Sequence, residues 1–203
     1  MRNLQPRYPP PEDRSARPEE PRLRARERYG AVAQALHWLI AALVLLMFGL
    51  GPYMVGLPLS QEKFDLYQLH KWFGVTIFGL AALRLMWRLW RPAPPLPASM
   101  PAWERTAART SHGLLYGLLF VQPVIGFLQS NAANFPVVLW GVLPLPPLIA
   151  PDEPLSETLL QAHHVVGFLF MVVVLVHVLA ALRHHFLLHD DVLRRMLPGR
   201  VRH

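Results

Sequence analysis

Apolar positions in this chain gather into long blocks separated by polar or proline-rich stretches. Four blocks run from about 31–55, 66–90, 106–130 and 159–186. Each approaches the roughly 20 apolar residues that an α-helix needs to cross a bilayer. The pattern therefore predicts an all-α integral membrane protein, a four-helix bundle in contact with membrane lipid.

The distribution of charge predicts the orientation of this bundle. Of the 20 Lys and Arg residues, 18 lie in the segments 2–28, 84–109 and 183–202, and only Lys63 and Lys71 lie elsewhere. If the first span starts inside, all three segments fall on the inner side, as the positive-inside rule requires. We therefore expect both termini to be cytoplasmic. The formal net charge of +7 is explained by basic residues that set the orientation of the spans and contact anionic lipid head groups. We therefore expect no nucleic-acid partner.

Three segments outside the apolar blocks have their own composition. Residues 1–28 hold six prolines, eight arginines and five acidic residues, which predicts a disordered cytoplasmic tail ahead of a membrane domain at 29–203. The loop at about 131–156 is rich in proline and carries Trp140, so we expect an interfacial lid on the outer surface. The stretch "LRHHFLLHDDVLRRML" predicts an amphipathic helix along the inner surface.

Histidine is the residue type that brings chemistry into the spans. The chain has ten histidines and no cysteine, which excludes disulfides and iron–sulfur ligation. Apart from His184 and His185 at the inner membrane surface, six histidines fall inside predicted spans, and topology sorts them by depth. The inner group is His37, His112 and His177, and the outer group is His70, His163 and His164.

Helical spacing relates two of these histidines directly. His163 and His177 are fourteen residues apart, so they share a helix face within about 40° and lie about 21 Å apart along the axis. This arrangement suits two stacked metal centres. A haem iron takes one ligand from each side of the ring, and depth then pairs His37 with His177 and His70 with His163.

Other interpretations of these histidines remain open. A single histidine in a span commonly makes a polar contact between helices or relays protons, and a haem-free transporter or proton channel would use it so. Zinc would require about four ligands at one point, whereas these candidates are divided between two depths. Gly74 and Gly167 follow His70 and His163 by four residues, where a missing side chain would admit a flat ring.

Several stretches together resemble the bacterial cytochrome b561 family, which is related to the di-haem cytochrome b subunits of nickel-iron hydrogenases. They are "RYGAVAQALHW", "LHKWFG", "RLMWRLWRPAPPLP", "AARTSHGLLYGLLFVQPVIGFL" and "HHVVGFLFMVVVLVHVLAALRHHFLLHDDVLRRMLP". The resemblance implies two haem b groups in a bacterial inner (plasma) membrane protein. It implies the iron ligands His37, His70, His163 and His177. His164 stands where some relatives have glutamate, which leaves the register open, and the fourteen-residue spacing favours His163.

The resemblance implies two hypotheses of function. In the first, an electron enters at the outer haem, passes to the inner haem and leaves to ubiquinone, with superoxide as a donor because some family members oxidise it. In the second, the chain is a membrane anchor subunit that relays electrons from a partner dehydrogenase or hydrogenase. Whether the chain is itself an enzyme depends on which hypothesis holds, and no catalytic residue is assigned.

A few further residues have two interpretations each. Lys71 would attract a small anion or serve as an interfacial anchor. Arg109 and His112, with Tyr116 one turn further on, would contact haem propionates or a quinone, and the alternative is solvation of the helix end. Three histidines at or beyond the inner membrane surface are expected to be solvated or to contact head groups: His184, His185 and His189.

Overall fold

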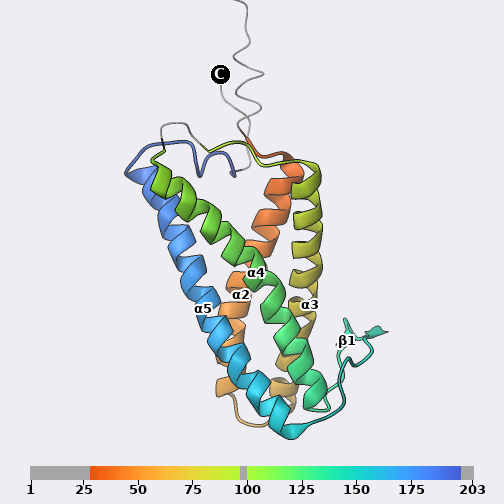
Figure 1. Ribbon diagram of the computed structural model, residues 1–203. Coiled ribbons are helices and arrows are strands. Elements are labelled where there is room, and N and C mark those ends of the chain that lie inside the picture. Colours follow the sequence, from red (N-terminus) through yellow and green to blue (C-terminus); the bar gives the residue numbers. More distant parts are fainter. Residues whose placement is uncertain (1–27, 97–99, 198–203) are drawn as a thin grey trace, which may run out of the picture.

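A computed structural model of the chain describes residues 28–96 and 100–197. It contains four long helices, α2 (Ala31–Gly56), α3 (Gln61–Trp90), α4 (Ala102–Ala132) and α5 (Glu153–Phe186), which form an up-and-down bundle (Figure 1). All four are long and apolar enough to cross a membrane. The predicted all-α membrane bundle is therefore confirmed. The cytoplasmic orientation of the termini stays a prediction, and the predicted tail lies outside the described residues except for Arg28.

Helices α3 and α5 begin several residues before the apolar blocks that predicted them. The hydroxyl of Ser60 accepts a hydrogen bond from the backbone N–H of Lys63 at 3.3 Å, and the Asp152 carboxylate accepts one from Leu155 at 2.9 Å. Such N-caps satisfy backbone donors that a new helix leaves free. The extra turns are polar, so a hydropathy pattern alone does not include them.

A small apolar core at mid-height joins the helices. It consists of Ile40, Val44, Ile77, Ala81, Leu118, Leu119 and Phe170. The rings of Phe48 and Phe170 meet edge to face here with their centroids 5.5 Å apart. Many other large apolar side chains are exposed on the outside of the bundle, as lipid-facing helices require. The core therefore separates the two ends of the bundle from each other.

The loop between α4 and α5 contains an antiparallel hairpin of β1 (Val138–Leu139) and β2 (Leu143–Pro144). Its turn places Trp140 and Gly141 at φ values of 51° and 71°, the left-handed region that tight hairpin turns use. The hairpin lies beside α3 (Figure 1), and the indole of Trp72 donates to the Val138 carbonyl at 2.6 Å. Ahead of it, Val137 lines a cavity inside the bundle.

The prediction of an amphipathic helix after the fourth span is wrong. Helix α5 ends at Phe186, and the following residues turn back across the inner end of the bundle. Carbonyls of residues 194–197 accept side-chain hydrogen bonds from Arg28, Gln34 and Trp38. His189, at φ 53°, takes the left-handed conformation that interrupts helices. These distant hydrogen bonds outweigh the weak preference of the segment for a helix.

Candidate functional site

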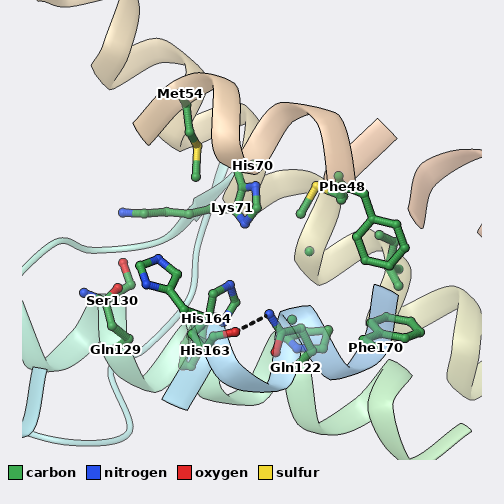
Figure 2. Close-up of a pocket in the computed structure, with 18 of the residues that line it drawn as sticks. Phe48, Met54, His70, Lys71, Gln122, Gln129, Ser130, His163, His164 and Phe170 are labelled. Carbon is green, nitrogen blue, oxygen red and sulfur yellow. Dashed lines mark hydrogen bonds between the residues drawn. The ribbon is translucent and has the colours of Figure 1, made fainter. Parts of the chain in front are cut away.

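The outer end of the bundle brings two imidazole rings close together at a steep angle. His70 of α3 and His163 of α5 have ring centroids 6.1 Å apart and ring planes 70° apart. Both line a cavity of about 460 Å³ with walls from all four helices (Figure 2). Most of the lining residues are apolar. Such a volume is within the range of pockets that hold a cofactor or another small molecule.

Helix α4 determines where the His163 ring lies. A Cβ added at Gly126 would lie 2.9 Å from Cε1 of His163 and 3.2 Å from its Nδ1, so only glycine leaves room for the ring. The side-chain amide of Gln122 donates to the His163 carbonyl at 3.0 Å (Figure 2). Sequence reasoning missed both residues. The available signal was Gln122 itself, a polar residue within the apolar run "LLFVQPV".

The two glycines noted after the outer histidines differ in their surroundings. A Cβ at Gly74 would meet nothing within 4 Å, and Gly74 lines the cavity as expected for a face that admits a ring. A Cβ at Gly167 would come within 3.0 Å of the Gln122 amide nitrogen. Gly167 therefore also makes room for the hydrogen bond between α4 and α5, a role that the sequence did not suggest.

Two basic residues stand next to the outer histidine pair. His164 and Lys71 both line the cavity (Figure 2), but the ring that faces His70 is that of His163. The Lys71 ammonium lies 3.5 Å from the Phe135 carbonyl oxygen and 5.4 Å from the centre of the Phe135 ring. The wall near the outer pair therefore carries a cation held by the loop after α4.

The inner end brings three imidazoles together. His37 of α2 and His177 of α5 have ring centroids 6.3 Å apart, with planes at 71°. The ring of His112 on α4 lies 5.6 Å from that of His177. Within residues 28–96 and 100–197, no group of three or more His, Asp or Glu side chains could hold one metal ion, so the zinc alternative finds no ligand set there.

Arginines of α3, rather than Arg109, lie near this inner group. Arg84 reaches across to α2 and donates to the Ala33 carbonyl at 2.6 Å. The guanidinium of Arg88 lies 5.6 Å from the centre of the Tyr116 ring. Arg109 itself is exposed. The sequence suggested Arg109 because it is close to His112 along the chain, whereas contact between α3 and α4 depends on the fold.

His184 is buried instead of being solvated as expected. Its Nδ1 lies 2.5 Å from an Asp190 carboxylate oxygen, and its Nε2 lies 3.8 Å from a Glu104 oxygen. The other Glu104 oxygen accepts a hydrogen bond from Arg183 at 3.0 Å. This inner clasp, formed by Glu104, Arg183, His184 and Asp190, joins α4, α5 and the C-terminal segment. Hydropathy did not reveal it because Asp190 lies outside any regular helix.

Both facing pairs have the separation that a shared haem iron requires. If one metal ion bound an imidazole on each side at about 2 Å, with about 1.2 Å from each ligating nitrogen to its ring centre, the two ring centres would lie about 6.4 Å apart. The observed separations are 6.1 Å and 6.3 Å. The buried Nδ1 atoms of His70 and His163 have no hydrogen-bond partner among the described residues. Since such atoms are costly to leave unpaired, a bound group fits this site.

Comparison with known proteins agrees with this geometry. Residues 28–199 match the family model of prokaryotic cytochrome b561. Cytochrome b561 homolog 2 of Escherichia coli K12 is 36% identical, over 84% of this chain and 92% of the relative. The probable superoxide oxidase CybB of Yersinia pestis is 26% identical, over 85% of this chain and 97% of the relative. Cytochrome b561 homolog 1 of Escherichia coli K12 is 23% identical, over 85% and 98%. This chain therefore belongs to the prokaryotic cytochrome b561 family of membrane haem proteins.

Proposed function

We propose that this protein carries two b-type haems and passes electrons from the outer side of the bacterial inner membrane to a quinone. One observation supports this proposal above the others. Two pairs of facing imidazoles stand at opposite ends of one bundle. Along α5 the two ends are separated by fourteen residues, or about 21 Å. A single haem would leave one of these pairs without a purpose.

In this proposal His70 and His163 hold the outer haem, and His37 and His177 hold the inner haem. A bound haem supplies a reversible one-electron change at its iron. Residues of α4 keep the outer ligand in position: the Gln122 amide binds the His163 carbonyl, and Gly126 leaves room for the His163 ring. The apolar core between the two ends excludes water from the space that separates the two centres.

The proposal also includes the orientation of the bundle in the membrane, the electron donor and the electron acceptor. The basic segments support an orientation with the inner pair and both termini on the cytoplasmic side. Superoxide is the proposed donor, supported by the relative described as a probable superoxide oxidase, and ubiquinone is the proposed acceptor. Lys71 on the cavity wall would attract a small anion toward the outer pair. His112, beside His177, is the candidate contact for a quinone or for haem propionates.

Two measurements on the purified chain test this proposal. The first is the haem-to-protein ratio with a reduced-minus-oxidised spectrum, which we expect to give two six-coordinate b-type haems per chain. The second is reduction of the chain by superoxide followed by reoxidation with a ubiquinone analogue. A ratio of one or none contradicts the di-haem assignment. Two haems without a superoxide reaction would favour an anchor subunit that receives electrons from a partner dehydrogenase or hydrogenase.

A further inference from the structure

We infer that the β1–β2 hairpin is an interfacial membrane anchor that lies in the head-group region of the outer leaflet beside α3. The partner is the lipid bilayer itself. This inference concerns a surface apart from the two histidine pairs, and it does not depend on haem.

The composition of the loop favours lipid over water. Residues 131–151 contain no Asp, Glu, Lys or Arg. The exposed fractions of the apolar side chains are high: Trp140 47%, Val142 82%, Leu143 56% and Leu148 69%. In water, the exposure of several large apolar side chains close together in the chain is unfavourable and usually marks a contact.

The attachment of the hairpin sets its depth in the membrane. Trp72 donates to the Val138 carbonyl at 2.6 Å, and its ring lies 5.3 Å from that of Trp140. Phe73 is 5.8 Å from the same Trp140 ring. Trp72 lies eleven residues after Gln61, the first residue of α3, or roughly 16 Å along the helix. Because the first turns of α3 are polar and its apolar block begins at about residue 66, the hairpin is fastened close to the outer edge of the membrane-spanning part of the helix.

The direction of the hairpin argues against a soluble protein as its partner. Figure 1 shows the hairpin projecting sideways from the bundle, beside α3 rather than beyond the helix ends. A soluble protein would dock on the end of the bundle, whereas the side of the bundle faces lipid. Tryptophan rings are enriched at this level of membrane proteins, and Trp72 and Trp140 together form such a belt.

Backbone hydrogen bonding limits how deep the hairpin lies. A two-stranded hairpin has unpaired edge groups, which are not tolerated in the hydrocarbon region. Three prolines, Pro144, Pro146 and Pro147, reduce the number of N–H donors that need a partner. The hydrated head-group region satisfies the remaining groups while the apolar side chains reach the acyl boundary.

Because the chain has no cysteine, one introduced cysteine carries one probe. Val142→Cys is labelled with an environment-sensitive fluorophore, and the protein is placed in phosphatidylcholine nanodiscs. The matched control is Glu62→Cys, an exposed position in the first turn of α3. At position 142 we expect blue-shifted emission, quenching by lipids with a shallow nitroxide, and several-fold weaker quenching by iodide than at position 62.

Two results would overturn the inference. Equal iodide quenching at positions 142 and 62 would place the hairpin in water. A probe shielded from iodide and also unquenched by nitroxide lipids would show that protein covers the hairpin, as a second copy would. A far-ultraviolet circular dichroism spectrum identical to that of the unaltered protein verifies the fold of the labelled variants. Absence of haem would contradict the proposed function without affecting the fluorescence result.

Discussion

At the scale of single residues, small side chains on one helix decide where a ring on the next helix can stand. Gly126 leaves room for His163, and Gly167 leaves room for the Gln122 amide that binds the His163 carbonyl. Each contact is formed between α4 and α5. The outer histidine pair therefore depends on residues that carry no chemistry of their own.

Replacing Gly126 with alanine tests this dependence. The added Cβ would lie 2.9 Å from Cε1 of His163, so we expect the ring to leave its present position opposite His70. We expect the haem-to-protein ratio to fall from two toward one, with the outer haem lost. Gly117→Ala on the same helix is the control, because its Cβ would meet nothing within 4 Å. An unchanged ratio and spectrum in Gly126→Ala would contradict the proposed position of the outer ligand.

Replacing His163 or His164 with alanine decides the register that the sequence left open. The ring of His163 faces His70, and His164 is its neighbour on the cavity wall. We expect His163→Ala to lose the outer haem and His164→Ala to keep two haems per chain. The reverse result would move the ligand by one residue.

Replacing Lys71 with glutamine separates its two interpretations. If the ammonium attracts superoxide, its loss should slow reduction by about two- to tenfold and weaken the dependence of the rate on salt. The haem-to-protein ratio should not change. If Lys71 is only an interfacial anchor, the rate and its salt dependence will match those of the unaltered protein.

At the scale of elements, the C-terminal segment is held to the helices by side chains rather than by continuing α5. The inner clasp links α4 to this segment through His184, which is buried between two carboxylates. The backbone carbonyls that follow bind side chains of α2. The segment therefore covers the inner end of the bundle as a separate, stabilised element.

Replacing His184 with alanine should loosen this element. The change removes the partner of the Asp190 carboxylate at 2.5 Å, and losing a partly buried contact of this kind costs about 1–3 kcal/mol. We expect faster limited proteolysis beyond Phe186 and a lower thermal midpoint. The control is Asp191→Asn, whose contact with Arg194 is exposed at 3.6 Å and contributes little. Equal proteolysis in the two variants would contradict the clasp.

At the scale of the whole molecule, the apolar core lies between the two ends of the bundle, so we expect the two proposed haem sites to bind independently. His37→Ala removes a ligand at the inner end, and the outer pair shares no side chain with that end. We expect the ratio to fall from two haems to about one, with the remaining haem still six-coordinate. The paired control, His70→Ala, should keep the inner haem. Its midpoint potential should differ from that of the outer haem that remains in His37→Ala. Two six-coordinate haems in His37→Ala would refute the pairing.

The sequence by itself determined the four spans and the relation between His163 and His177, because both follow from properties of single helices. Hydrophobic length predicts a span, and helical repeat predicts a shared face. The tertiary structure decided the rest. The roles of Gly126 and Gln122 depend on how α4 and α5 align, and the C-terminal segment turns back because Arg28, Gln34 and Trp38 bind its carbonyls. Contacts between residues distant in the chain leave no periodic pattern along it, so only the packed bundle reveals them.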